Sequence, residues 1–227
     1  MVQVEYNNIK GRVINMELKN KKIVFLGDSI TEGRDTTSES NIYHQIIKRE
    51  CELSLACNCG ISGTRIANRR VPTYNATKMD LYFGLRENVM PRDVDIVVVF
   101  GGTNDYGHGN GGELGDIDSN DDYTFNGALN NLITNLKKHN PNASIIFLTP
   151  LHRINDNTSI NGTGLVLRDY VNTIIEATKR HNVYLIDLFN ELTLDPYDKS
   201  LVPDGLHPNN EGHLILAKFL IKKLLEL

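Results

Sequence analysis

A short apolar run that ends in a polar turn, within residues 22–33, is the feature that most constrains the fold of this chain. Four consecutive apolar residues follow two lysines and precede Gly27, Asp28 and Ser29. An uninterrupted apolar run is typical of a strand buried on both faces, as in a parallel sheet. Such a strand carries the residues after it to the carboxyl edge of the sheet, where open α/β folds bind ligands. Ser29 is therefore either a functional-site residue or only a helix cap or turn residue.

The same pattern of an apolar run followed by small polar residues recurs along the chain. Further strands are expected at residues 53–58, 94–100, 144–148 and 184–187. Apolar residues at helical spacing predict helices at residues 41–50, 125–136 and 165–181, a shorter helical piece near 78–87, and a final helix after residue 209. Strands that alternate with helices of this length predict an α/β fold, with a parallel sheet of about five strands covered by helices on both faces.

The composition favours one globular domain over residues 1–227. A chain of 227 residues can bury one substantial core, and the sequence has no internal repeat or linker. The net charge of −4, without a basic stripe, argues against nucleic acid as a partner. Residues 1–20 alternate weakly between apolar and polar, which predicts an N-terminal hairpin or edge strand.

The sequence lacks the apolar segments of membrane and secreted proteins. No apolar run approaches the roughly 20 residues that a membrane-spanning helix requires, and the first residues contain no apolar core of a secretory signal. The three cysteines, Cys51, Cys57 and Cys59, form neither a disulfide framework nor a zinc-ligand pattern. We therefore expect a cytoplasmic location, no membrane partner, reduced thiols with two of them in a strand, and no bound metal. The oligomeric state is not indicated.

Ser29 is a candidate nucleophile, but a serine hydroxyl needs a base to take its proton. His207 is the best base among the seven histidines, because Asp204 lies three residues before it. On one tight turn the Asp204 carboxylate reaches Nδ1 of the imidazole, which fixes the tautomer and leaves Nε2 to face the serine. These three residues predict a Ser-His-Asp triad, although His207 taken alone could be an ordinary loop histidine.

Two further polar turns supply candidate oxyanion donors. Gly60 can present a bare backbone N–H, and Asn104 offers a side-chain amide, in addition to the N–H of Ser29 itself. Taken singly, Gly60 could be only a turn glycine and Asn104 only a helix cap. Their order along the chain is what favours function: a serine turn, a glycine turn, an asparagine turn and then Asp-x-x-His, each after a strand or before the last helix.

At this point the sequence resembles the SGNH hydrolase family, also called GDSL-like lipases and acylhydrolases. The resemblance rests on four blocks in order: Gly27-Asp28-Ser29-Ile30, Asn58-Cys59-Gly60-Ile61-Ser62-Gly63, Gly101-Gly102-Thr103-Asn104-Asp105 and Asp204-Gly205-Leu206-His207-Pro208-Asn209. It implies a flavodoxin-like three-layer α/β/α sandwich that needs no cofactor. It also implies catalytic Ser29, Asp204 and His207, with an oxyanion hole at Ser29, Gly60 and Asn104.

The polar loops expected to border the site indicate the kind of ester. Residues 62–77, 105–121 and 152–164 are rich in Gly, Asn, Asp, Thr and Arg, and the chain has no tryptophan. Such walls favour a small-molecule ester with a short, acetyl-like acyl group on a polar or carbohydrate alcohol. The alternatives are a lysophospholipase or thioesterase for longer acyl chains, and a non-catalytic sugar- or nucleotide-binding module on the same fold.

Several other polar residues have open assignments. His108 and His152 follow strands and could line the pocket, whereas His213 is expected on a helix as a structural residue. Three arginines, Arg34, Arg65 and Arg153, are either solvated surface charges or contacts to a polar or anionic part of the substrate.

Overall fold

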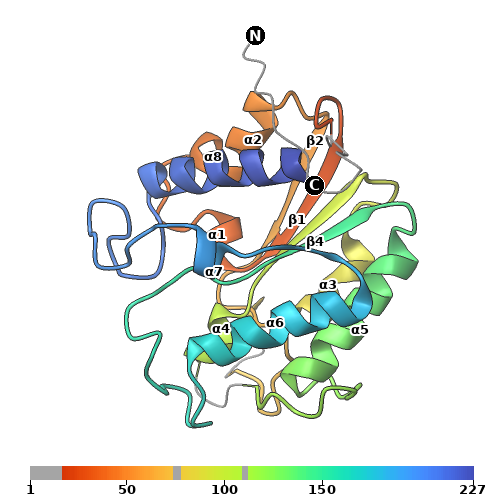
Figure 1. Ribbon diagram of the computed structural model, residues 1–227, viewed down its shortest axis with the longest axis vertical. Helices are drawn as coiled ribbons and strands as arrows, with labels where there is room; N and C mark the ends of the chain where they lie inside the picture. Colours follow the sequence, from red (N-terminus) through yellow and green to blue (C-terminus); the bar gives the residue numbers. More distant parts are fainter. Residues whose placement is uncertain (1–16, 74–77, 109–111) are drawn as a thin grey trace.

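The computed structural model of the protein describes residues 17–73, 78–108 and 112–227. Its centre is a five-stranded parallel sheet with the order β2-β1-β3-β4-β5 (Figure 1). The strands are β1 Lys22–Gly27, β2 Leu55–Gly60, β3 Ile96–Phe100, β4 Ser144–Leu148 and β5 Tyr184–Ile186. This is the predicted flavodoxin-like three-layer α/β/α fold.

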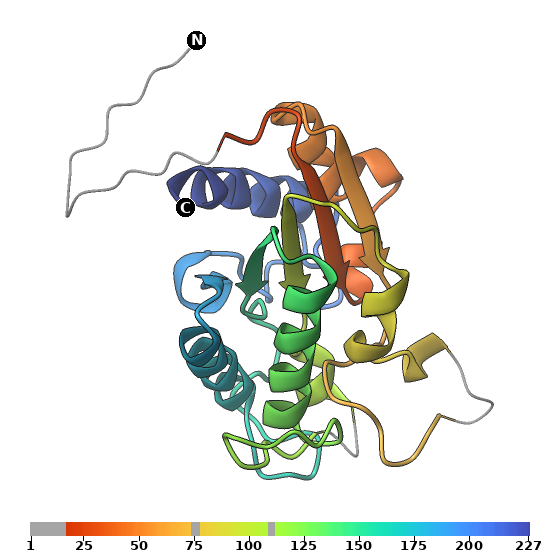
Figure 2. The same ribbon diagram turned by 90° about the vertical axis from the view of Figure 1, so that its right-hand side faces the viewer.

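Helices cover both faces of the sheet in two separate layers (Figures 1 and 2). The longer helices are α2 Tyr43–Glu50, α5 Phe125–His139, α6 Leu167–His181 and α8 Asn210–Glu226. The short ones are α1 Ser29–Glu32, η1 Glu39–Asn41, η2 Lys78–Asp80, α3 Phe83–Arg86, η3 Glu87–Val89, α4 Thr103–Gly107 and α7 Leu188–Glu191. Apolar residues of α2 and α8 form one core with the sheet, and those of α3, α5 and α6 form a second core on the opposite face.

The parallel register brings the ends of the central strands together. Gly27, the last residue of β1, pairs with Gly60 of β2 on one side and with Phe100 of β3 on the other. Because parallel strands share one direction, the turns that follow these three residues meet at one edge of the sheet. The turns that carry Ser29 and Asn104 therefore start from adjacent strand ends.

The predicted elements are present, with differences at their ends. The second strand begins two residues later than expected, and it extends to Gly60 because its pairing with β1 continues to Gly27. The helix expected from residue 41 begins at Tyr43, since Ile42 has extended backbone angles. Most of the predicted N-terminal hairpin lies outside the described residues, and residues 17–21 contain no strand. Cys57 and Cys59 lie in β2 as free thiols, as predicted.

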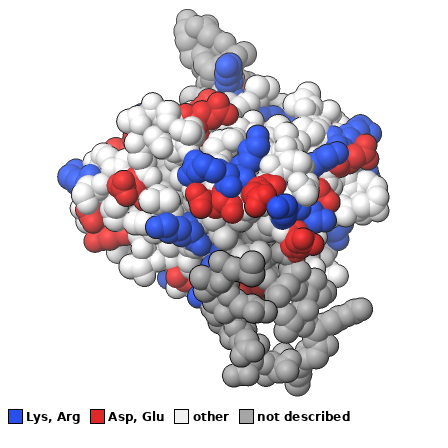
Figure 3. All heavy atoms as spheres, turned by 90° about the horizontal axis from the view of Figure 1, so that it is seen from above, with Lys and Arg blue, Asp and Glu red and all other residues white. Residues whose placement is uncertain are grey.

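Charged side chains of both signs share one face of the molecule. Seen from above, Lys and Arg side chains are interspersed with Asp and Glu side chains on that face (Figure 3). Within the described part of the chain, none of the helices combines the length and the apolar composition needed to cross a lipid bilayer.

Arg86 of α3 ties the ends of β1 and β2 together from inside the protein. This side chain is 4% exposed. Its Nη1 donates to the carbonyl oxygens of Gly27 at 3.0 Å and Cys59 at 2.7 Å, and its Nη2 donates to Oγ1 of Thr64 at 3.0 Å. Burial lowers the pKa of Arg86 to about 10, so the guanidinium still carries its charge at neutral pH. One buried cation thus satisfies acceptors on both strands that border the functional edge.

Arg86→Met is expected to lower the free energy of unfolding by roughly 2–4 kcal/mol, because it leaves buried acceptors without their donors. Equilibrium urea denaturation measures this loss. Arg49→Met is the control, since Arg49 is exposed and both of its partners, the carboxylate of Glu50 at 3.3 Å and the carbonyl oxygen of Ser40 at 3.4 Å, are exposed as well. We expect Arg49→Met to stay within about 0.5 kcal/mol of the parent protein. Equal stability of the two variants would show that Arg86 does not hold the strand ends.

Candidate active site

Ser29 is the first residue of α1, directly after the β1 turn. Asp28 caps this helix, with its Oδ1 accepting the N–H of Ile30 at 3.0 Å. A Cβ at Gly27 would lie 2.0 Å from Oγ1 of Thr31, so the turn can be this tight only with glycine there. Ser29 is 4% exposed, and its own N–H has no hydrogen-bond partner among the described residues. The turn thus offers a hydroxyl and a free backbone donor at the same residue.

His207 lies in the loop before α8 and contacts both other members of the predicted triad. Its Nε2 is 2.9 Å from Oγ of Ser29, and its Nδ1 is 2.6 Å from Oδ2 of Asp204. Partial burial opposes ionisation of Asp204. The N–H groups of His207 and Leu206 and the imidazole outweigh burial and lower the pKa of Asp204 to about 2. The carboxylate is therefore charged at neutral pH and hydrogen-bonded to the ring nitrogen that faces away from Ser29.

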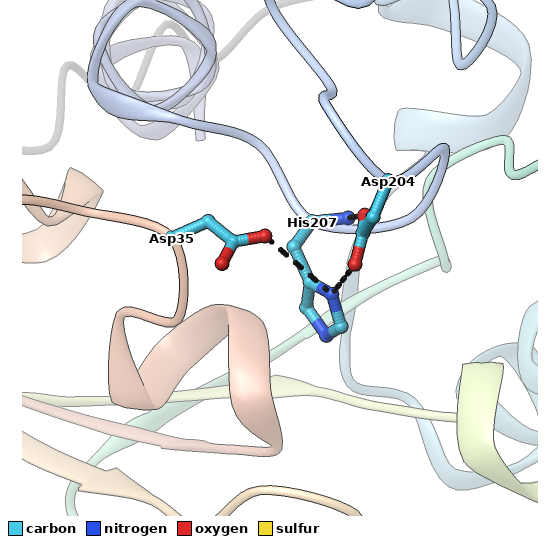
Figure 4. A group of neighbouring side chains, drawn as sticks. All are labelled: Asp35, Asp204 and His207. Atoms are coloured by element: carbon cyan, nitrogen blue, oxygen red, sulfur yellow. Dashed lines mark hydrogen bonds and ion pairs between the residues drawn. The ribbon is translucent and has the colours of Figure 1, made fainter.

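A second carboxylate, from Asp35, approaches the same imidazole from the loop after α1 (Figure 4). Its Oδ2 lies 4.0 Å from Nδ1 of His207, too far for a hydrogen bond but close enough to attract the imidazole when the ring carries a second proton. Ligand atoms of Asp35, Asp204 and His207 lie within 4.8 Å of one another, a spacing that could also suit a cation. The expectation of no metal here stays a prediction.

Asn104 comes from α4, at the end of β3, and is 4% exposed. Its Nδ2 donates to the carbonyl oxygen of Thr64 at 2.9 Å, which joins the turn after β3 to the turn after β2. A primary amide has two N–H bonds, so one remains to bind another acceptor.

Gly60 serves the packing of β2 against α1. A Cβ at this position would lie 2.1 Å from the backbone nitrogen of Glu32. The N–H of Gly60 donates to Oδ1 of Asn58 at 2.9 Å. In this conformation, the donor that we expected at the oxyanion hole is therefore already used within the strand end.

Gly63, which the sequence analysis did not single out, has a backbone N–H without a partner among the described residues. It has a left-handed backbone with φ of +74° and directly precedes Thr64, whose carbonyl oxygen accepts from Asn104. The signal in the sequence is the second glycine of the Gly60-Ile61-Ser62-Gly63 turn, since a left-handed residue in a turn favours glycine.

The remaining histidines have different surroundings. His213 is fully buried and its Nδ1 accepts the N–H of Tyr43 at 3.2 Å, which confirms its structural position. His152 is 2.5 Å from the carboxylate of Asp156 and packs on Phe189. His108 directly follows α4, and its N–H donates to the carbonyl oxygen of Asn104 at 3.0 Å.

The three arginines of the sequence analysis differ in how far their side chains are exposed. Arg34 is exposed. Arg65 is 1% exposed, and its Nη2 donates to the carbonyl oxygen of Asn68 at 3.0 Å, so it is not the solvated surface charge that was one of its two alternatives. Arg153 is half-buried beside α4 and donates to Thr103 at 3.3 Å.

Known proteins resemble this chain in sequence and in fold. The model of the GDSL-like lipase/acylhydrolase family matches residues 25–215. A solved structure of a protein from Lactobacillus plantarum is 30% identical, covers 91% of this chain and 97% of its own, and has a TM-score of 0.76. No match was found among curated proteins.

More distant solved structures share the fold. A member of the lipolytic protein G-D-S-L family from Veillonella parvula is 19% identical, with 91% of this chain and 99% of that chain covered and a TM-score of 0.61. The acetyl xylan esterase AlAXEase is 21% identical, with coverages of 89% and 98% and a TM-score of 0.58. The chain belongs to the GDSL-like lipase/acylhydrolase family, and its class of activity is ester hydrolysis.

Asp204→Asn is expected to lower kcat/KM for p-nitrophenyl acetate by roughly 10²- to 10⁴-fold, because the amide no longer holds the imidazole in the tautomer that can accept a proton. Asp35→Asn is the matched control. It removes a carboxylate that lies 4.0 Å from Nδ1 of His207, the nitrogen that Asp204 contacts, but that makes no hydrogen bond to it. We expect Asp35→Asn to lose less than about tenfold. A larger loss for Asp35→Asn than for Asp204→Asn would exchange their roles.

Proposed function

We propose that the protein is a serine esterase that works through an acyl-enzyme intermediate. The observation that carries this proposal is the continuous chain of contacts from Ser29 through His207 to Asp204, at 2.9 Å and 2.6 Å. In the first step, Nε2 of His207 takes the serine proton while Oγ attacks the ester carbonyl. The imidazolium then gives that proton to the leaving alcohol. In the second step, His207 activates water in the same way, and the acid is released from Ser29.

Three N–H donors can stabilise the negative charge that develops on the carbonyl oxygen. We assign them to the backbone of Ser29, the side chain of Asn104 and the backbone of Gly63. Gly63 replaces Gly60 in this proposal because the N–H of Gly60 donates to Asn58, whereas that of Gly63 has no partner among the described residues. Donors fixed in place before the reaction stabilise a transition-state oxyanion without reorganisation, and losing one typically costs about 10²- to 10³-fold in kcat.

The substrate we propose is a short-chain, acetyl-like ester of a polar or carbohydrate alcohol. Two charged side chains lie near the triad: Asp35 lies beside His207, and Arg153 lies beside the start of α4. The loops that follow the strand ends are rich in polar residues and glycine. An acetyl xylan esterase shares the fold, which is compatible with this substrate class. Polar walls can hydrogen-bond hydroxyl groups but bury little of an acyl chain.

Ser29→Ala is expected to abolish ester hydrolysis and labelling by a fluorophosphonate probe, because it removes the attacking oxygen without opening a core cavity. Ser62→Ala is the matched control, since Ser62 also follows a strand end but its hydroxyl donates to the side chain of Glu32. Mass spectrometry after labelling locates the modified residue. If the parent protein is not labelled and hydrolyses no ester, the chain is a binding module on this fold.

The acyl-chain preference is tested with p-nitrophenyl esters from acetate to decanoate. We expect kcat/KM to be highest for acetate or propionate and to fall for longer chains. An apolar groove would instead give up to about 0.8 kcal/mol, or roughly fourfold, for each methylene it buried. A steady rise towards decanoate would therefore contradict the short-acyl proposal and favour a lysophospholipase or thioesterase.

A further inference from the structure

The segment after β4 places Arg153 next to the turn that carries Asp204 and His207. The N–H of Ile154 donates to the carbonyl oxygen of Gly205 at 2.9 Å. Gly205 follows Asp204 and has φ of +79°, and a Cβ on it would lie 2.6 Å from the side chain of Ile154. The residue next to Arg153 is therefore packed against the turn that carries Asp204 and His207.

The guanidinium of Arg153 is held over α4 by several contacts. Its Nη1 donates to both the carbonyl oxygen and Oγ1 of Thr103, each at 3.3 Å. The guanidinium carbon lies 5.4 Å from the centroid of the Tyr106 ring, a cation–π arrangement. A Cβ at Gly107 would lie 2.4 Å from Nη1, so the absence of a side chain there leaves room for the arginine. The cation is thus fixed beside Asn104, the proposed oxyanion donor.

The positive charge of Arg153 has no direct counter-ion among the described residues. Arg69 differs, because its Nε lies 3.9 Å from a carboxylate oxygen of Asp80. The nearest acidic groups act on Arg153 only through space: burial lowers its pKa, while Tyr106, Asp204, Asp28 and Asp156 oppose that shift. Asp204 and Asp156 are hydrogen-bonded to His207 and His152. In the hydrogen bonds between described residues, Nη2 and Nε of Arg153 have no acceptor.

His108, directly after α4, lies within the electrostatic influence of three arginines. Burial, together with the positive charges of Arg69, Arg65 and Arg153, lowers the pKa of His108 to about 4. His108 is therefore neutral at pH 7 and can donate or accept a hydrogen bond. Arg65 and Arg69 lie near the carboxyl groups of Asp105 and Asp80, so Arg153 is the guanidinium beside α4 that can attract a negatively charged ligand.

We propose that Arg153 binds an anionic group, a carboxylate or a phosphate, on the alcohol part of the ester substrate. This inference rests on the proposed esterase function. We place the anion on the alcohol part of the substrate because His207 donates its proton to the leaving alcohol. Arg153 lies beside the turn that carries His207. Nη1 is fixed by Thr103, so Nη2 is the group that meets the anion. The natural substrate is then an ester whose alcohol part carries a negative charge, such as a uronate-type or a phosphorylated alcohol.

The test compares two acetate esters of nearly equal shape that differ in charge, 3-acetoxybenzoate and 3-acetoxybenzamide. For the parent protein, we expect kcat/KM for the carboxylate to exceed that for the amide by about tenfold or more, the usual scale of one charge-assisted hydrogen bond. Arg153→Gln is expected to bring the ratio of the two values close to one. High ionic strength is expected to reduce the ratio in the parent protein.

Arg168→Gln is the matched control. Arg168 also lies over an aromatic ring, with its guanidinium carbon 4.6 Å from the centroid of Phe189, but it is on the exposed surface of α6. We expect this variant to keep the parent ratio. A parent ratio near one, or a ratio unchanged in Arg153→Gln, would overturn the proposal. An equal loss on both esters in Arg153→Gln would also overturn it, because it would assign Arg153 a structural function.

A binding measurement separates this inference from the esterase proposal. Calorimetric titration of the Ser29→Ala protein with 3-hydroxybenzoate, phenyl phosphate and 3-hydroxybenzamide requires no turnover. Tighter binding of either anion than of the amide, lost on adding Arg153→Gln, supports the anion site and shows whether carboxylate or phosphate fits. Equal affinity for all three ligands would refute the anion site. If neither ester is hydrolysed but the anions bind through Arg153, only the esterase proposal fails.

Discussion

The parallel register of β1 with β2 and β3 is the constraint on which the rest of the structure depends. Because Gly27 pairs with both Gly60 and Phe100, three turns begin at the same height along one edge of the sheet. Glycines at the first two of these strand ends leave space for α1 to pack closely. Arg86 then satisfies carbonyl oxygens of both β1 and β2 from inside the core. A shift of one residue in this register would separate the turns that form the site.

The contact between Ser29 and His207 joins residues 178 positions apart in the chain. Such a contact is stable only because each partner is fixed locally: Ser29 by the Asp28 cap, and His207 by the carboxylate of Asp204. The Asp204 carboxylate also accepts the backbone N–H of His207 at 2.7 Å. The site is therefore built from two rigid local turns that the fold brings together, which is how pre-organised catalytic groups avoid the entropy of assembling during the reaction.

Much of this site could be predicted from sequence because its residues lie in short local patterns. Asp-x-x-His predicts its own hydrogen bond, since a carboxylate three residues before a histidine can reach the ring within one turn. Gly60 illustrates the limit. This position requires glycine because β2 packs closely on the backbone of Glu32, and the N–H of Gly60 donates to Asn58. The sequence indicates neither contact. The approach of Asp35 to His207 and the surroundings of Arg153 likewise depend on how the loops are placed.

The sequence by itself determined the α/β alternation, the polar turns after the strands and the Asp204–His207 pair, because these follow from periodicity and from contacts within a few residues. Tertiary structure alone decided the strand order, the approach of Asp35 to His207 and the position of Arg153 over the ring of Tyr106. Those contacts join residues from loops that do not adjoin in the sequence. Their distances depend on how two helical layers pack on a twisted sheet, and no local pattern of residue types encodes that packing.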